Sequence, residues 1–210
     1  MIAIIDYGMG NLRSVQKAVE KVGRDAVITR SPQVIADARA VILPGVGAFK
    51  DCMDNLERFS LIDPVLKAIS SGKPFLGICL GLQLLFSESL EFGRHPGLGV
   101  VKGVVRPFPV DLPDPDRPGA ALKIPHMGWN AVEIRKPHPA LVPVNDGDYF
   151  YFVHSYYVEP KDPGIAATVT DYGIDFVSAI AFDNVLATQF HPEKSQRQGL
   201  ALLQAFAGQR

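Results

Sequence analysis

Cysteine is scarce in this chain of 210 residues, which holds only Cys52 and Cys79. Two cysteines far apart in the sequence, with no Cys-x-x-Cys pair, argue against a disulfide framework and a zinc knuckle. The histidines and acidic residues show no ligand-pair spacing either, so we expect no metal site and no cofactor. The pattern is typical of a reducing compartment, and we expect the chain in the cytoplasm.

An excess of charge of one sign and a long hydrophobic run are also absent. The chain has 21 basic and 22 acidic residues and a formal net charge of -1, which offers no electrostatic basis for binding nucleic acid. The longest strongly apolar run, 75–86, is shorter than the roughly 20 residues of a bilayer span. The first residues lack the basic leader of a signal peptide. With 47% hydrophobic residues, the chain is expected to form one domain over 1–210 that is not in a membrane.

Short apolar runs alternate with helical periodicity in the first half of the chain. Strands are predicted over 2–6, 25–29, 40–43 and 73–78, and helices over 11–22, from Ser31-Pro32, and over 61–71. Strands separated by helices imply parallel pairing, with a ligand crevice at the carboxyl ends of the strands. The loops that follow three of these strands have unusual compositions and should converge there.

The second half of the chain has a different pattern of predicted elements. Strands are predicted over 99–106, 131–134, 148–152, 165–169, 177–182 and 185–189, and an exposed loop over 107–118, which is rich in proline and aspartate. These strands resemble hairpins that extend the sheet. The expected fold class is α/β, with a mostly parallel central sheet, flanking helices and an antiparallel extension.

The strongest chemical signal is Cys79, placed where a buried strand turns sharply into a helix. Gly77 and Gly81 stand on either side of it, as small residues must where strand and helix crowd together. The positive end of a helix dipole favours the thiolate form of a cysteine. We therefore interpret Cys79 as an exposed, reactive nucleophile, with a small core residue as the alternative.

A cysteine nucleophile needs a base and a group that orients the base. The strand predicted over 185–189 ends at His191, and the rigid turn at Pro192 can bring Glu193 back to the imidazole. We predict His191 as the base and Glu193 as its orienting partner. The remaining histidines have no carboxylate so near and are interpreted as surface or loop residues: His95, His126, His138 and His154.

Five motifs carry a resemblance to a known family. They are Asp6-Tyr7-Gly8-Met9-Gly10-Asn11-Leu12 and the segments 44–49, 77–86, 125–130 and 189–195. Together with the order Cys, His, Glu along the chain, they resemble class I glutamine amidotransferases, whose fold is flavodoxin-like. More narrowly, they are similar to the glutaminase subunits of imidazole glycerol phosphate synthase.

The resemblance implies a glutaminase reaction. Cys79 would attack the side-chain amide of glutamine and form a thioester with release of ammonia, while His191 transfers protons and Glu193 stabilises the imidazolium. The residues expected to hold the polar groups of the substrate are Gly45, Gln83, Ser155 and Tyr156.

The oxyanion of this reaction needs backbone donors, for which Leu80 and the loop residues Val46 and Gly47 are the candidates. Relatives usually have Pro-Gly-Gly where this chain has Pro44-Gly45-Val46, and a β-branched residue reaches positive φ only at considerable cost. We expect an incomplete oxyanion hole at rest and a poor glutaminase in isolation, until a partner with bound ligand shifts the loop. The alternative is that Val46 packs against the core with the donors already in place.

The resemblance also implies a partner, the cyclase subunit of imidazole glycerol phosphate synthase, a (β/α)8 barrel. In this heterodimer the ammonia is used to make imidazole glycerol phosphate and an aminoimidazole carboxamide ribotide in histidine biosynthesis. Candidate interface residues are Met127, Trp129 and Asn130, expected in a loop, and Asn11, Tyr151 and Lys194, expected beside the ammonia passage. For Trp129, packing in the core is the alternative.

Two other functions are compatible with parts of the pattern. The first is the glutaminase component of another synthase, such as anthranilate or aminodeoxychorismate synthase, against which the segments 44–49 and 128–130 argue. The second is a binding module that keeps the fold without the chemistry. The intact set of Cys79, His191 and Glu193 argues against it.

Overall fold

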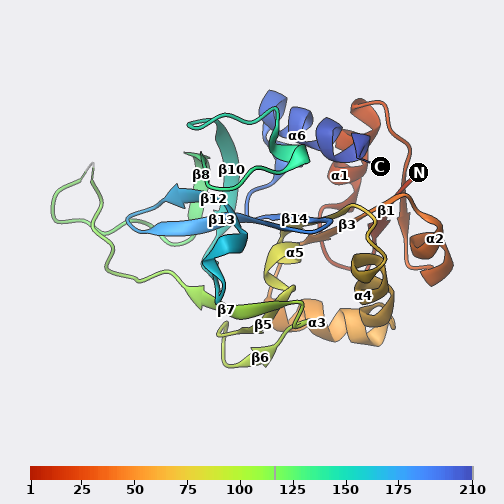
Figure 1. Ribbon diagram of the computed structural model, residues 1–210. Coiled ribbons are helices and arrows are strands. Elements are labelled where there is room, and N and C mark those ends of the chain that lie inside the picture. Colours follow the sequence, from red (N-terminus) through yellow and green to blue (C-terminus); the bar gives the residue numbers. More distant parts are fainter. Residues whose placement is uncertain (116, 210) are drawn as a thin grey trace.

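Continuous apolar runs form the parallel part of a large mixed sheet. The computed structural model describes residues 1–115 and 117–209, so Asp116, within the predicted loop 107–118, and Arg210 lie outside the described residues. The parallel strands are β1 (Ile2–Ile5), β2 (Ala26–Thr29), β3 (Ala40–Gly45), β4 (Phe75–Cys79) and β14 (Val185–Thr188). They pair in the order β2-β1-β3-β4-β14 (Figure 1). All but β2 are buried along their whole length, which explains why they read as unbroken apolar runs.

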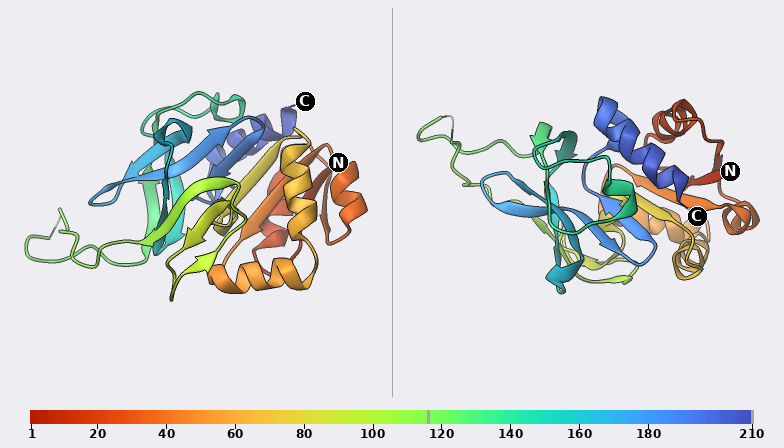
Figure 2. Two further views of the ribbon diagram at one scale, coloured as in Figure 1. Left: turned by 60° about the horizontal axis from the view of Figure 1, so that its bottom comes forward. Right: turned by 45° about the horizontal axis from the view of Figure 1, so that its top comes forward.

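Helices cover both faces of this parallel part (Figures 1 and 2). Alternate side chains of β1, such as Ile2 and Ile4, pack under α1 (Leu12–Lys21) and α6 (Gln196–Gly208). The other set, including Ala3 and Ile5, packs with the opposite helices. These are α2 (Pro32–Asp37), α3 (Phe49–Arg58), α4 (Ile62–Ser70) and the single turn α5 (Leu80–Gln83).

Beyond β14 the sheet continues mainly with antiparallel pairs, which confirms the predicted mixed α/β class. Its further strands are β5 (Phe86–Ser89), β6 (His95–Pro96), β7 (Val101–Pro107), β9 (Glu133–Ile134), β11 (Tyr156–Pro160), β12 (Ala166–Asp171) and β13 (Asp175–Phe182). One pair here is parallel, between β5 and β7. Within the described part of the chain, no helix combines the length and apolar character needed to cross a membrane.

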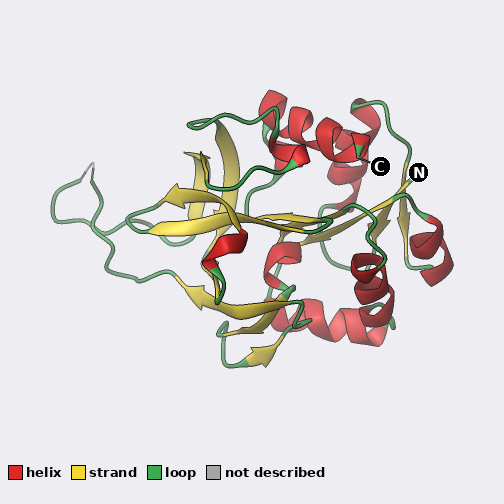
Figure 3. Ribbon diagram, viewed as in Figure 1, coloured by secondary structure: helices red, strands yellow, loops and turns green. Residues whose placement is uncertain are grey.

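A separate antiparallel pair, β8 (His126–Ala131) and β10 (Tyr149–His154), stands beside the main sheet. The described residues of the long loop between β7 and β8 project from the body of the molecule (Figure 3). Short 3-10 helices occur at η1 (Pro139–Leu141), η2 (Pro163–Ile165) and η3 (Pro192–Lys194).

The prediction of one strand over 131–134 was wrong. The chain forms β8 from His126 onward, and β9 covers only Glu133–Ile134. Exposed and more buried positions alternate from His126 to Asn130, but the more buried positions hold His126, Gly128 and Asn130, so no apolar alternation appears in the sequence. The candidate docking residues Met127, Trp129 and Asn130 consequently lie on a strand and not in a loop.

Candidate active site

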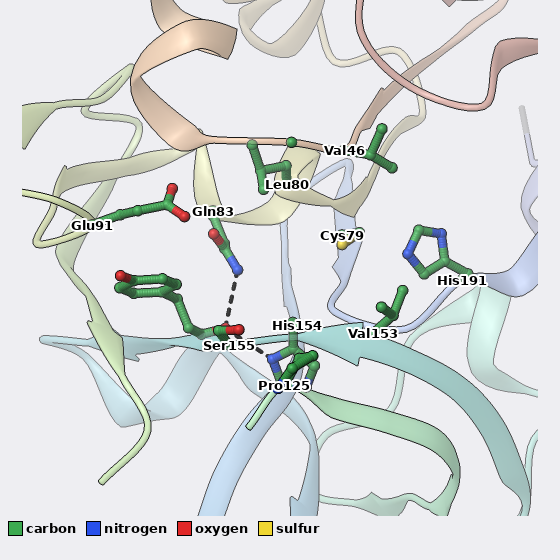
Figure 4. Close-up of a pocket in the computed structure, with 12 residues that line it drawn as sticks. Val46, Cys79, Leu80, Gln83, Glu91, Pro125, Val153, His154, Ser155 and His191 are labelled. Carbon is green, nitrogen blue, oxygen red and sulfur yellow. Dashed lines mark hydrogen bonds between the residues drawn. The ribbon is translucent and has the colours of Figure 1, made fainter. Parts of the chain in front are cut away.

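The carboxyl ends of β3, β4 and β14 meet at one edge of the sheet, as the parallel pairing requires. The chain that leaves these strands borders a pocket of about 300 Å³. Figure 4 shows its wall, which is formed by Val46, Gly47, Cys79, Leu80, Gln83, Glu91, Pro125, Val153, His154, Ser155, Tyr156 and His191. The predicted thiol and imidazole therefore share one cavity.

Cys79 occupies a sharp turn between β4 and α5. Its backbone has φ +55° and ψ -109°, a conformation that a non-glycine residue adopts only at a cost. The glycines on either side are required: a Cβ at Gly81 would lie 1.8 Å from the carbonyl oxygen of Leu43, and one at Gly77 would lie 2.8 Å from the carbonyl oxygen of Gly81. The predicted elbow is present.

The predicted exposure of Cys79 was wrong. The residue is only 4% exposed, because the pocket wall closes around its sulfur. The helix behind it, α5, is a single turn, so it offers far less of the dipole effect than a longer helix would. Any activation of the thiol must come chiefly from side chains in the pocket.

His191 is such a side chain. It follows β14, and its backbone N–H donates to the carbonyl oxygen of Tyr151 at 2.9 Å. Its Nδ1 lies 2.8 Å from Oε1 of Glu193, and both side chains are buried. Because a carboxylate oxygen accepts, Nδ1 carries the proton, and the Nε2 edge of the ring is turned toward Cys79 (Figure 4).

The charges around His191 favour its protonated form. Burial alone would lower the pKa of the imidazole, but negative charge on the Cys79 sulfur and the Glu193 carboxylate raises that pKa to about 10. Within the described residues, His191 Nε2 is buried and makes no hydrogen bond. This arrangement allows His191 to hold a proton that it exchanges with the sulfur or with a leaving group.

Two glutamine side chains join the thiol to the opposite wall of the pocket. Gln189 Nε2 donates to Cys79 Sγ at 3.6 Å, and Gln189 Oε1 accepts from Gln83 Nε2 at 3.0 Å. The second Nε2 proton of Gln83 goes to the carbonyl oxygen of Tyr156 at 3.1 Å. Of the predicted substrate residues, Gln83, Ser155 and Tyr156 thus lie together at the pocket.

The fourth predicted substrate residue, Gly45, lies behind the pocket wall. It pairs with Cys79 in the sheet, and a Cβ at this position would meet Tyr7 Oη at 2.6 Å and Leu80 Cβ at 2.7 Å. Among the oxyanion candidates, Val46, Gly47 and Leu80 border the cavity. The positive φ of this loop falls on Gly47, at +102°, and not on Val46.

Glu91 is a pocket residue that the sequence did not reveal. It lies in the loop after β5, and its Oε2 accepts a hydrogen bond at 2.5 Å from the backbone N–H of Phe49, which begins α3. Burial raises the pKa of its carboxyl group. The pairing of β5 with β7 and the hydrogen bond to Phe49 N hold this segment at the cavity, and no local motif marks it.

Three of the candidate interface residues lie side by side. The rings of Trp129 and Tyr151, which face each other across β8 and β10, have centroids 6.2 Å apart, and Lys194 Nζ lies 5.7 Å from the centre of the Tyr151 ring. Met127 and Trp129 are 63% and 44% exposed, so core packing does not account for Trp129. Asn130 is on the same strand, and the exposed Asn11 precedes α1.

The interpretation of His126 and His154 as surface or loop residues was wrong. Both are buried on strands, where they face each other across β8 and β10. His95 lies on β6 and His138 precedes η1, both partly buried. Among residues 1–115 and 117–209, no group of three His, Cys, Asp or Glu side chains is placed to hold a metal ion.

Comparisons with solved structures show the same fold. A protein described as a glutamine amidotransferase matches with a TM-score of 0.73 and 19% identity, and the match covers all of both chains. PurLQS from Thermotoga maritima matches with a TM-score of 0.73 and 16% identity, over 98% of this chain and 96% of that chain. At these identities the likeness concerns the fold alone.

Sequence comparisons place the chain more narrowly. It is 55% identical over 206 residues to the imidazole glycerol phosphate synthase subunit HisH of Syntrophotalea carbinolica, covering 98% of each chain. It is 52% identical over 204 residues to the HisH subunit of Aquifex aeolicus, covering 97% of this chain and 94% of that protein. The family model described as glutamine amidotransferase class-I matches residues 3–208. The chain therefore belongs to the class I glutamine amidotransferase family and, within it, to the family of HisH subunits.

Proposed function

We propose that this chain hydrolyses glutamine to glutamate and ammonia, as the glutaminase subunit of an imidazole glycerol phosphate synthase in the cytoplasm. The observation that carries the proposal is the pocket in which Cys79 faces an imidazole paired with a buried carboxylate. The relatives named HisH support this synthase over anthranilate or aminodeoxychorismate synthase as the destination of the ammonia.

The reaction follows from the three side chains. The Cys79 sulfur attacks the amide carbon of glutamine, and the tetrahedral intermediate collapses as the C–N bond breaks and His191 protonates the departing nitrogen, which leaves as ammonia. Water then attacks the thioester while His191 takes a proton from it, which frees glutamate and the thiol. Glu193 holds the imidazole with Nδ1 protonated, so Nε2 performs both transfers.

The intermediate carries negative charge on oxygen, and we assign its stabilisation to backbone N–H groups. One is that of Leu80, at the start of α5 behind the thiol. The other comes from Val46 or Gly47 in the loop after β3. We infer that this second donor is not in place at rest, because orienting the Val46 peptide toward the pocket requires a backbone arrangement that a β-branched residue resists.

The first prediction concerns this second donor. We expect glutamate release by the isolated chain to rise about 100-fold when a cyclase subunit and its ligand are added, the typical effect of one oxyanion donor. Initial rates measured with the chain alone, with the cyclase, and with the cyclase and its ligand check this. Equal, rapid turnover in all three mixtures would show that the donors are already in place, and no glutamate in any mixture would contradict the proposed function.

Glutamine also needs partners for its α-amino and α-carboxylate groups. Among the side chains that line the pocket, Glu91 supplies the carboxylate that suits an ammonium group. The backbone around Ser155 and Tyr156 faces the same space and suits the α-carboxylate. Gln83 lies between these groups and the thiol, through its bonds to Tyr156 and Gln189.

The second prediction is that Glu91→Gln raises KM for glutamine about 10-fold or more while kcat changes less than about 3-fold, because a hydrogen bond to a charged group contributes about 1.5–3 kcal/mol. The amide oxygen of the new side chain can still accept from Phe49 N, so α3 keeps its contact. Steady-state kinetics check the result. Glu88→Gln, on the same segment and paired with Arg94 at 3.5 Å, is the matched control and should leave KM unchanged.

We propose that the barrel-shaped cyclase docks over the face that carries Met127, Trp129 and Asn130. The exposed apolar surface of Met127 and Trp129 suits the centre of an interface. Tyr151 lies next to Trp129, and Lys194 lies over the Tyr151 ring. Both are bonded to the backbone of His191, Tyr151 O accepting from His191 N and Lys194 N donating to His191 O. Together with Asn11, these two residues are proposed to border the route by which ammonia leaves the pocket.

A further inference from the structure

Two buried histidines connect the proposed docking face to the pocket wall. His126 on β8 and His154 on β10 are directly opposite each other in the strand pair, and they are 3% and 6% exposed. Buried imidazoles must satisfy both ring nitrogens, or they destabilise the fold. Their hydrogen-bond partners therefore reveal how the protons are arranged.

The hydrogen bonds of these two histidines start at the pocket wall. His154 Nδ1 lies 2.8 Å from the carbonyl oxygen of Tyr156 (Figure 4). A carbonyl oxygen only accepts, so Nδ1 of His154 carries the proton and, in the neutral ring, Nε2 is an acceptor. His126 Nδ1 lies 2.9 Å from that Nε2 and must donate to it. Both rings thus have the proton on Nδ1.

The hydrogen bonds at the end away from the pocket, between His126 and Asn130, are also defined. His126 Nε2 is left as an acceptor, and Asn130 Nδ2 approaches it at 3.3 Å. The same amide group donates to the carbonyl oxygen of Asp171 at 2.8 Å, while Asn130 Oδ1 accepts from Ala131 N. Along this line Asn130 donates to His126, His126 donates to His154, and His154 donates to the Tyr156 carbonyl at the pocket wall.

The surroundings keep both rings neutral. Phe108, Phe152, Tyr172 and Phe176 surround His126 with ring contacts, and burial lowers the pKa of His126 to about 4 and that of His154 to about 3. At neutral pH the direction of donation is therefore fixed. A charged ring would present two N–H groups and oppose the donor beside it.

The Tyr156 carbonyl is where this chain of hydrogen bonds reaches the substrate site. It accepts from His154 on one side and from Gln83 on the other. The segment that contains it, Ser155-Tyr156, joins β10 to β11 at the pocket wall. Loss of the His154 donor leaves the carbonyl with one bond from a side chain that must also hold Gln189.

We propose that His154, held in its tautomer by His126 and Asn130, is a positioning residue that fixes the Ser155-Tyr156 wall for the α-carboxylate of glutamine. The inference rests on the proposed function, because it assigns glutamine to this pocket. His154 acts through the Tyr156 carbonyl and takes no part in bond making. Its effect therefore falls on substrate binding and not on the chemical step.

The kinetic test, the third prediction, compares two replacements of similar size in the complex with the cyclase. His154→Asn keeps an N–H donor at the position of Nδ1, whereas His154→Leu removes it. We expect His154→Leu to raise KM for glutamine about 5- to 10-fold with kcat within about 3-fold of wild type, and His154→Asn to restore KM to within about 2-fold. An equal rise of KM in both variants would show that His154 only packs against its neighbours, which contradicts the proposal. An unchanged KM in both variants would also overturn it.

A second measurement does not depend on activity. Histidine labelled with 15N gives distinct NMR patterns for the two neutral tautomers, and His126→Asn and His154→Asn assign the signals. At pH 7 both rings should show the proton on Nδ1, and a proton on Nε2 of His154 would overturn the proposal. Wild-type complex that releases no glutamate would contradict the proposed function, whereas the tautomers would still test the hydrogen-bond arrangement.

Discussion

Cys79→Ala is expected to lower glutamine hydrolysis by about 10⁴-fold or more, because no other group in the described part of the pocket can form the thioester. The change removes one sulfur atom from a side chain that is already nearly buried, and alanine can occupy the same turn. The folded state should therefore persist. Glutamate release by the complex with the cyclase checks the prediction. Circular dichroism spectra of the wild-type and Cys79→Ala chains check that the variant is folded.

The second cysteine provides the matched control. Cys52 is fully buried on α3, and burial raises the pKa of its thiol to about 12, so it does not react as a thiolate. Its sulfur lies 3.7 Å from Tyr7 Oη and from the carbonyl oxygen of Val46. Cys52→Ser keeps a group that can make these contacts and should retain activity within about 3-fold. Turnover by Cys79→Ala within tenfold of wild type would remove Cys79 from the mechanism.

Gly81→Ala is expected to lower the free energy of unfolding by about 3 kcal/mol, at the upper end of the usual cost of overpacking. The added Cβ would meet the carbonyl oxygen of Leu43 at 1.8 Å and its carbonyl carbon at 2.9 Å. Leu43 belongs to β3, which is paired on both sides by β1 and β4 and cannot move aside. Equilibrium unfolding in urea, followed by far-ultraviolet circular dichroism, measures the loss.

Gly208→Ala is the control for the glycine replacement. Gly208 also lies in a helix, at the end of α6, and a Cβ added there would have no heavy atom from another part of the described chain within 4 Å. Alanine has the higher helix propensity, so this variant should be within about 1 kcal/mol of wild type. A Gly81→Ala protein as stable as wild type would show that the elbow relaxes without cost.

The parallel half of the fold and the thiol, imidazole and carboxylate were predictable from sequence. Strands such as β1 and β4 are buried on both faces and leave an unbroken apolar run. The elbow at Cys79 and the turn from His191 to Glu193 are local, so each leaves a pattern within a few residues. Their meeting in one pocket follows from the rule that ligands bind at the carboxyl ends of parallel strands.

The residues that sequence reasoning missed depend on pairing between distant segments. Glu91 is held at the pocket by the pairing of β5 with β7 and by its contact with the start of α3, and His126 meets His154 through the register of β8 with β10. Neither position has a sequence neighbour that reveals its environment. Long-range pairing is a tertiary property, and it decides whether a histidine lies in a surface loop or in the core.

The place of β14 in the sheet has a consequence for the order in which the chain folds. β14 lies between β4 and β13, so the strand that leads to His191 fills a central position although it lies far along the chain from β4. Until β14 is added to the sheet, β4 has an unpaired edge and Cys79 has no imidazole beside it. A partly folded chain therefore holds the thiol without its proposed base, and the two come together only when the centre of the sheet is complete.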